Sequence, residues 1–244
     1  MKKGFLFIVA VTFLIAALIY FVFTIGSEWI SSAVADIIPI EIQKKIGQTS
    51  LSSMETQELE ASNLPQYTQN KISKRFFHLI QQDSSEVKLY FKRASYPNAF
   101  ALPGNYIVIL DSLVKMSKDT ANYTDVLGVL AHEYGHLHYK HSLKLVIKGG
   151  LIGVIISYFV GDFSLVVAGM AKQMLSLSYS RNYEEQADDY AISLMRKNNL
   201  SLLPLATMLE SIDKMNVSGN VPAFLSTHPG TEDRVKKLRG TSNL

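Results

Sequence analysis

The chain begins with an uninterrupted apolar segment. Residues 4–25 carry no charged side chain, and as a helix at about 1.5 Å per residue they would extend roughly 33 Å, enough to cross the hydrocarbon core of a bilayer. The residues directly after this segment, Gly26 to Trp29, lack the small-residue A-x-A pattern of a signal-peptide cleavage site. The pattern therefore predicts a retained signal anchor over residues 1–26 rather than a signal peptide that is removed.

The charges that flank this segment predict its orientation. Lys2 and Lys3 precede it, and Glu28 is the first charged residue that follows it. The positive-inside rule places the two lysines in the cytoplasm and the rest of the chain across the membrane. We therefore expect a single-pass protein of the bacterial inner membrane. We expect the lipid bilayer to be one partner and the rest of the chain to face the periplasmic, extracytoplasmic side.

A second apolar stretch covers residues 143–177. Asp162 is the only charged residue of this stretch between Gly149 and Ala171, and it follows Gly161 at a break between two apolar pieces. Each piece is too short to span a bilayer alone. The pattern favours a pair of buried or interfacial helices, and a re-entrant hairpin that enters the bilayer is the alternative.

Periodic apolar positions predict the remaining elements. A helix that turns at Pro39 is expected over residues 28–47, and a polar segment over 48–66 follows it. Further helices and strands follow from the 3.6-residue and two-residue periods of apolar side chains. The helices are expected over residues 68–82, 122–142, 180–198, 201–215 and 231–239, and the strands over 87–92 and 105–110.

These elements predict a mainly helical α+β fold with a small sheet, behind an N-terminal transmembrane helix. We expect three parts along the chain. They are the anchor over residues 1–26, an interfacial helix with a polar lead-in over 27–66, and one domain over 67–244 that includes the apolar pair.

Composition narrows the possible functions. Two of the 24 Lys and Arg side chains lie in residues 1–26, so the remainder nearly balances the 21 Asp and Glu side chains. No basic face is left for phosphate groups, which excludes nucleic acid as a partner. The chain has no cysteine, which excludes disulfides, thiolate metal sites and a cysteine nucleophile. Any metal site must therefore use His, Asp or Glu. No feature of the sequence indicates an oligomeric state.

One five-residue motif carries the chemistry. His132 and His136 frame the sequence HEYGH, and residues four apart on a helix share one face. Both imidazoles can therefore bind one metal ion, with Glu133 beside them as a general base. Zinc suits nitrogen and oxygen donors, and a catalytic zinc ion has three protein ligands and one open position.

The third ligand must also come from His, Asp or Glu. The segment 180–191 is expected to be helical, and it places Glu184 and Asp188 four residues apart on one face. We assign Glu184 as the third ligand and Asp188 as the acceptor that fixes the tautomer of a ligand imidazole. Glu185 is the competing carboxylate, and it would point about 100° away around the helix.

These motifs resemble a known family. HEYGH together with SRNYEEQAD (180–188) is similar to the HtpX-like gluzincin zinc metallopeptidases. That family includes the CAAX prenyl proteases, a mitochondrial inner-membrane stress peptidase and periplasmic quality-control peptidases. Three further segments match the family pattern: NAFALPG (98–104), His141-Ser142 and STHPGTEDR (226–234). HtpX itself has several transmembrane helices and a cytosolic active site, whereas this chain has one predicted span and a predicted periplasmic domain.

The resemblance implies a zincin-like domain and a role for each matching residue. His132, His136 and Glu184 would bind one zinc ion per chain, and Glu133 would be the general base. His228 would lie in the active site, where it either stabilises the oxyanion or caps the zinc ion in a resting state. The alternative for His228 is an ordinary loop position.

Other matching positions concern the substrate and the surrounding loops. Arg234 is expected to fix its loop through a carboxylate rather than to touch substrate. His138 and His141 are interpreted as structural. One further segment is a candidate strand that an extended peptide substrate could pair with. The alternative is an ordinary edge strand without a role in substrate binding. The residues of this candidate strand are Asn98, Ala99, Phe100, Ala101 and Leu102.

The sequence thus predicts a membrane-anchored zinc metalloendopeptidase that hydrolyses peptide bonds in proteins. Its expected role is quality control of envelope or membrane proteins. Two alternatives belong to other classes. One is a chaperone-like binding protein whose zinc site is latched or structural, and the other is a membrane scaffold without a metal.

Overall fold

The computed structural model describes most of the chain outside the two long apolar segments. The described residues are 4, 12–13, 26–81, 86–149, 178–216 and 223–241. The predicted anchor and the predicted apolar helix pair therefore lie almost entirely outside the described residues. Among the described residues, no helix combines the length and the apolar character that a membrane crossing requires.

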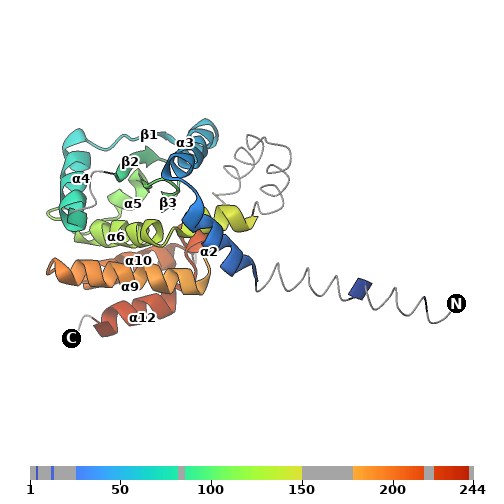
Figure 1. Cartoon of the computed structure of the whole chain (residues 1–244). Coiled ribbons are helices and arrows are strands. Elements are labelled where there is room, and N and C mark those ends of the chain that lie inside the picture. The colour runs from blue at the N-terminus through green and yellow to red at the C-terminus, as the bar shows by residue number, and fades with distance from the viewer. Residues whose placement is uncertain are drawn as a thin grey trace.

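A small mixed sheet forms one layer of the fold (Figure 1). Its order among the described residues is β1-β2-β4-β3, in which β4 runs parallel to β2 and antiparallel to β3. The strands are β1 (Glu60–Ala61), β2 (Lys88–Arg93), β3 (Ala99–Leu102) and β4 (Tyr106–Leu110). β3 therefore lies at one edge of this sheet.

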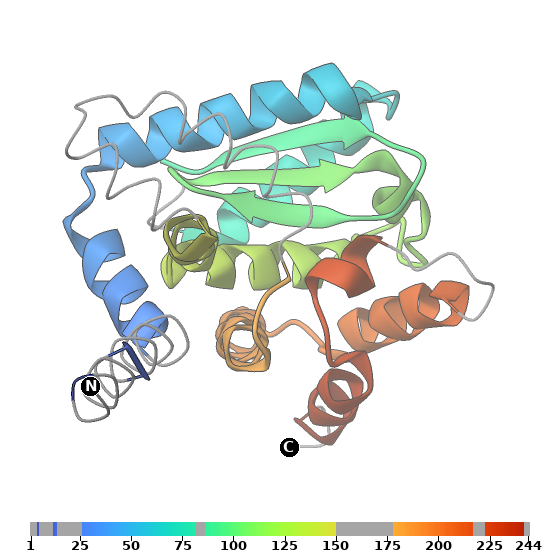
Figure 2. The same ribbon diagram turned by 90° about the vertical axis from the view of Figure 1, so that its right-hand side faces the viewer.

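Helices cover both faces of the sheet. Figure 2 shows α3 along one face and α6 along the other. Side chains alternate between the faces of a strand, so Ile107 and Ile109 of β4 pack in the main core with α4 and α6. Tyr106 and Val108, between them, pack instead with Leu51 and Met54 of α3. The apolar run of β4 is therefore explained by burial on both sides.

The helical layer confirms the predicted mainly helical α+β class. α6 lies between the sheet and the helices α9 and α10, so its apolar side chains are buried all round (Figure 1). The helices are α2 (Ser27–Ile37), α3 (Ile40–Gln57), α4 (Gln66–Ile80), α5 (Asp111–Lys115), α6 (Thr124–His138), α9 (Arg181–Lys197), α10 (Leu203–Asn216), α11 (Ala223–Thr227) and α12 (Thr231–Thr241).

The prediction of one helix over residues 122–142 is wrong at the C-terminal end. α6 ends at His138, and Lys140 adopts a left-handed φ of 55°. A residue in this conformation ends a helix because its N–H bonds back to a carbonyl of the last turn, and Lys140 N–H donates to Leu137 O at 3.0 Å. A second helix then starts at His141 and continues to residue 149.

The helix predicted to stop at Gly47 is also longer than expected. α3 continues ten residues further to Gln57, because Leu51 and Met54 are buried against the sheet. Gly47 lies where α3 crosses the turn before β4, and a Cβ there would be 2.0 Å from the Pro103 carbonyl oxygen. The glycine thus permits a close helix crossing rather than ending the helix.

Candidate active site

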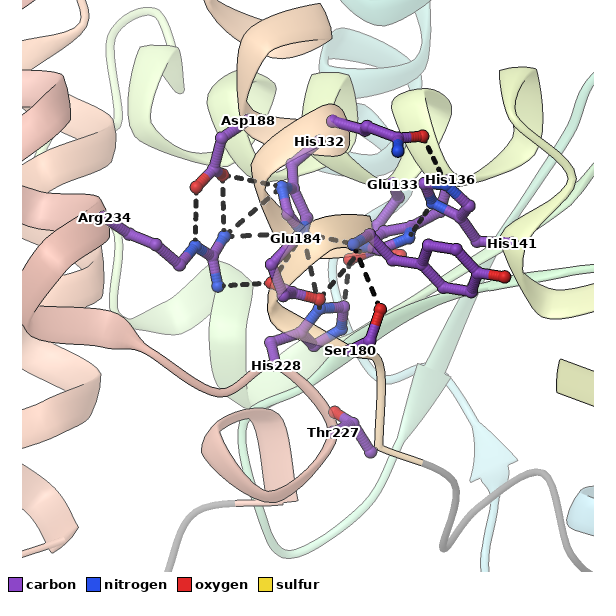
Figure 3. Close-up of polar contacts among 12 residues, drawn as sticks. His132, Glu133, His136, His141, Ser180, Glu184, Asp188, Thr227, His228 and Arg234 are labelled. Atoms are coloured by element: carbon purple, nitrogen blue, oxygen red, sulfur yellow. Dashed lines mark hydrogen bonds and ion pairs between the residues drawn. The ribbon is translucent and has the colours of Figure 1, made fainter. Parts of the chain in front are cut away.

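The HEYGH motif lies in the buried middle of α6. His132 and His136 are 1% and 0% exposed, and their Nε2 atoms lie 3.0 Å apart. This is the arrangement that the four-residue spacing predicts on a helix. Figure 3 shows both rings directed toward α9 and the loop that carries His228.

α9 brings a carboxylate to the same point. Ser180 caps this helix by accepting a hydrogen bond from the Tyr183 N–H at 3.3 Å, which places Glu184 in the first turn. Glu184 Oε1 lies 3.4 Å from His136 Nε2, and Oε2 lies 3.5 Å from His132 Nε2. The competing Glu185 is exposed and lies near Lys237 at the surface, 3.9 Å from its Nζ.

His228 completes this group from the loop between α11 and α12. Its Nδ1 lies 3.0 Å from Glu184 Oε1 and 3.3 Å from His132 Nε2, and its side chain is fully buried. Among the described residues, His132, His136, Glu184 and His228 each offer a ligand atom, and these atoms lie within 4.8 Å of one another.

The geometry of this cluster fits zinc. Tetrahedral zinc with nitrogen and oxygen ligands at about 2.0–2.1 Å places its ligand atoms about 3.3 Å apart. The distances between neighbouring donor atoms run from 3.0 to 3.5 Å. Buried imidazole and carboxylate groups at this spacing are costly unless a cation or protons neutralise them. The donor set and its spacing therefore suit one zinc ion.

Glu133 stands next to this cluster with its carboxylate unsatisfied. Both oxygens are buried and have no hydrogen-bond partner among the described residues. The nearest basic group is His228, whose Nε2 lies 3.5 Å from Glu133 Oε1. Burial raises the pKa of Glu133 to about 7, while the charges of His228 and Arg234 act to lower it. The carboxyl group can therefore exchange a proton near neutral pH.

A second group of charges holds the cluster from the α12 side. Asp188 Oδ1 accepts a hydrogen bond from His132 Nδ1 at 2.9 Å. Arg234 binds both oxygens of Asp188, at 2.8 and 2.9 Å, and its Nη1 lies 2.7 Å from Glu184 Oε2. Burial opposes ionisation of Glu184, but the nearby charges of His228 and Arg234 hold its pKa well below the usual value. Arg234 is 6% exposed, so its ion pairs tie the last helix to the site.

Aromatic and imidazole groups hold the opposite side of His136. Tyr179 stacks on its ring with centroids 3.8 Å apart, and His141 Nδ1 lies 2.9 Å from His136 Nδ1. Sequence reasoning did not identify Tyr179, although its position directly before the cap Ser180 is a usable signal. His138 is exposed and packs against Tyr190 instead.

A small cavity of about 30 Å³ adjoins His228 and β3. The candidate substrate strand supplies one wall, and all of its residues from Asn98 to Leu102 are buried. The side chains that line the cavity are mostly apolar. They are Met54, Asn98, Phe100, Ala101, Leu102, Ser142, Leu145, Tyr179, Thr227 and His228.

This combination of an HExxH helix, a glutamate from a second helix and buried charged neighbours is typical of zinc metallopeptidases. The chain belongs to peptidase family M48, whose model matches residues 66–242. The family predicted from the sequence motifs is thereby confirmed. Zinc is the cofactor of M48 metalloproteases, which agrees with the predicted cofactor and enzyme class.

Several curated metalloproteases are similar to this chain. The mitochondrial metalloendopeptidase OMA1 of Schizosaccharomyces pombe is 27% identical over 175 residues, covering 69% of this chain and 50% of OMA1. Metalloprotease LoiP of Escherichia coli is 27% identical over 149 residues, covering 58% of this chain and 57% of LoiP. Metalloprotease YcaL of Escherichia coli is 25% identical over 206 residues, covering 80% of this chain and 78% of YcaL. The chain thus spans little more than half the length of OMA1 and LoiP.

Proposed function

We propose that this protein is a membrane-anchored zinc endopeptidase that cleaves protein or peptide substrates. The observation that carries the proposal is the unsatisfied, buried carboxylate of Glu133 beside the donor atoms of His132, His136 and Glu184. A carboxylate buried without a hydrogen-bond partner costs stability, and such a cost is typical of a group retained for chemistry.

Each residue has a defined role in this proposal. His132, His136 and Glu184 would hold a zinc ion, which would supply a Lewis acid for the scissile carbonyl and for water. Glu133 accepts a proton from the attacking water and delivers it to the leaving amine nitrogen. Burial raises its pKa above the usual value, which favours a carboxylate that takes up a proton and releases it in one cycle.

His228 acts as a cap of the resting site in this proposal. Its Nδ1 lies among the donor atoms of the cluster, where a fourth protein ligand fills the position that a catalytic site leaves open. The loop between α11 and α12 must then withdraw His228 before cleavage.

The substrate chain pairs with β3 in this proposal. β3 lies at an edge of the sheet, and an extended peptide adds to such an edge through backbone hydrogen bonds. Asn98 to Leu102 would then align the substrate beside Glu133 and His228. The adjoining cavity has a volume of only about 30 Å³, so the site would have to open before it could accept a substrate side chain.

The proposed location at the membrane rests on the apolar segment over residues 4–25 and on the helix α2 that follows it. Trp29 and Ile37 of α2 are 80% and 77% exposed, and their spacing of eight residues places them on one face of the helix. An exposed Trp next to a spanning segment is typical of the membrane interface. A catalytic domain anchored there would act on envelope or membrane proteins, and we propose their quality control as its role.

A Glu133→Gln variant tests the proposed chemistry. We expect the purified variant to bind one zinc ion per chain, measured by metal analysis, and to lose cleavage of casein. Glu185→Gln is the matched control, because the carboxylate of Glu185, next to Glu184 in the sequence, is exposed. This variant should cleave at the wild-type rate. Unchanged cleavage by Glu133→Gln contradicts the mechanism, and a wild-type chain without zinc contradicts the metal site.

A His228→Ala variant separates the resting cap from the chaperone-like alternative. A cap predicts that cleavage rises, or first becomes measurable, in the variant. A binding protein with a structural zinc site predicts no cleavage by either form. Protease accessibility of the domain in intact cells and spheroplasts tests the topology, and protection in spheroplasts would place the domain in the cytoplasm.

A further inference from the structure

Three polar side chains, beginning at the Nδ1 atom of His136, contact one another in series. His136 Nδ1 lies 2.9 Å from His141 Nδ1, and His141 Nε2 lies 3.2 Å from Gln186 Oε1. His141 begins the helix after the Lys140 turn, whereas Gln186 lies on α9 two residues beyond Glu184. These three residues therefore connect α6, the following helix and α9.

With its amide oxygen facing His141 Nε2, Gln186 favours one proton arrangement of these groups. The amide oxygen of Gln186 can only accept, so His141 Nε2 must carry the hydrogen. Neutral His141 then has a bare Nδ1, which accepts the hydrogen of His136 Nδ1–H. His136 in turn has a lone pair on Nε2, the atom that lies 3.4 Å from Glu184 Oε1 within the donor cluster.

His141 is held rigidly in this position. Its side chain is 0% exposed, and its ring stacks on Tyr183 with centroids 4.1 Å apart and planes 10° apart. Tyr139 stacks at 5.5 Å with an interplanar angle of 22°. This stacking fixes the orientation of the His141 ring and therefore the direction of its hydrogen bonds. A residue that orients a metal ligand needs such a fixed orientation.

We propose that His141 and Gln186 are positioning residues that hold His136 in its Nδ1–H tautomer, with Nε2 directed at the metal. This inference rests on the proposed zinc site. It gives the two ligand histidines different supports, since His132 is oriented by the Asp188 carboxylate and His136 by a neutral imidazole and an amide.

Zinc affinity of the full-length chain tests this inference. His141→Phe keeps a stacking ring but removes the acceptor, and we expect zinc binding to weaken by about 10- to 100-fold, the usual cost of losing such a support. His138→Phe is the matched control, because His138 is exposed and lies two residues from the zinc ligand His136. It should bind zinc with the wild-type Kd, measured by competition with a chelator.

A substitution at the half-buried Gln186 keeps the test decisive if His141→Phe does not fold. Gln186→Leu removes the acceptor, and we expect zinc binding to weaken in the same direction by about tenfold. Equal zinc affinity in wild type, His141→Phe and Gln186→Leu would overturn the inference.

A spectroscopic measurement separates this inference from the proposed function. With ¹⁵N-labelled histidine in the zinc-free chain, NMR should show His136 protonated at Nδ1 in wild type and redistributed between both nitrogens in Gln186→Leu. His136 protonated at Nε2 in wild type would overturn the inference even if zinc binds. Absence of zinc binding by wild type with the expected tautomer would instead overturn only the proposed function.

Discussion

Gly135 of α6 and Ala187 of α9 lie in direct backbone contact. A Cβ placed on Gly135 would lie 3.0 Å from both the Cα and the carbonyl oxygen of Ala187. The residues beside this contact are His136 on one helix and Glu184 and Asp188 on the other. The separation of these two backbones therefore determines how close the imidazoles come to the carboxylate.

A Gly135→Ala substitution should push the two helices apart. The better helix propensity of Ala contributes about 1 kcal/mol, but overpacking against backbone costs about 1–3 kcal/mol, so we expect a small net loss of stability. Zinc binding should weaken by about tenfold, because ligands on both helices are displaced. Gly240→Ala on α12 is the control, since a Cβ there meets nothing within 4 Å, and it should stabilise the protein without changing zinc affinity. A wild-type zinc Kd in Gly135→Ala would show that this contact does not set the site.

Two arginines on α12 make comparable ion pairs at different depths. Buried Arg234 binds both oxygens of Asp188, whereas exposed Arg239 binds both oxygens of Glu210, at 2.7 and 2.9 Å. Lys cannot reproduce the planar two-point contact of Arg. Arg234→Lys should therefore reduce the free energy of unfolding by about 3 kcal/mol, and Arg239→Lys by less than about 1 kcal/mol. Urea unfolding measures both values, and equal losses would contradict the structural role of Arg234.

Asp119 stabilises the start of the helix that carries HEYGH. Its carboxylate accepts hydrogen bonds from the Thr124 hydroxyl at 2.8 Å and the Asn122 N–H at 2.9 Å. The Thr124 hydrogen bond lowers the pKa of Asp119 below its usual value. Asp119→Ala should destabilise the protein by about 1 kcal/mol at neutral pH, as other losses of a helix cap do.

The stability contributed by Asp119 should depend on pH in a defined direction. A carboxyl group whose pKa is lower in the folded state stabilises the fold above its unfolded pKa, and this stability is lost as the pH falls through the folded pKa. The difference in Tm between wild type and Asp119→Ala should therefore be full at pH 6 and should shrink as the pH falls below the ordinary Asp pKa of about 3.9. Asp213→Ala, at an exposed position of α10, is the control. A pH-independent difference would mean that ionised Asp119 is not the stabilising form.

Removal of metal should destabilise the fold. Ligands that bind only the folded state stabilise it by about 2.7 kcal/mol at 100 times their Kd, and the donor cluster joins α6, α9 and the loop before α12. We therefore expect a chelator to lower the Tm and added zinc to restore it. Glu184→Gln should show little dependence of its Tm on zinc. The same Tm for wild type with chelator and with zinc would contradict the proposed metal site.

The sequence predicted the helical half of this site because its spacing is local. His132 and His136 are four residues apart on one helix, and Glu184 follows a recognisable cap at Ser180. The mutual geometry of residues on one helix follows from the helix itself. The main helices and the small sheet could be anticipated in the same way, from apolar periodicity.

The contacts that could not be predicted join distant parts of the chain. Local spacing does not indicate that His228 approaches His132 across 96 positions, and only the family resemblance placed His228 in the active site. No sequence signal indicated that His141 faces His136 rather than solvent. The left-handed turn at Lys140 redirects the chain, and Lys is not a residue that signals such a turn. The prediction that the helix stops at Gly47 was wrong because the sequence alone does not distinguish a glycine in a close helix crossing from a glycine at a helix end.

That crossing has a consequence for where the functional unit begins. The family model starts at residue 66, but Met54 of α3 lines the cavity beside His228 and Leu51 covers the sheet below it. A fragment that starts at residue 66 would retain every proposed zinc ligand and Glu133, yet it would expose one apolar face of the sheet and open one side of the cavity. The region that the family model matches contains the proposed catalytic groups, whereas the preceding helix α3 completes the cavity beside them.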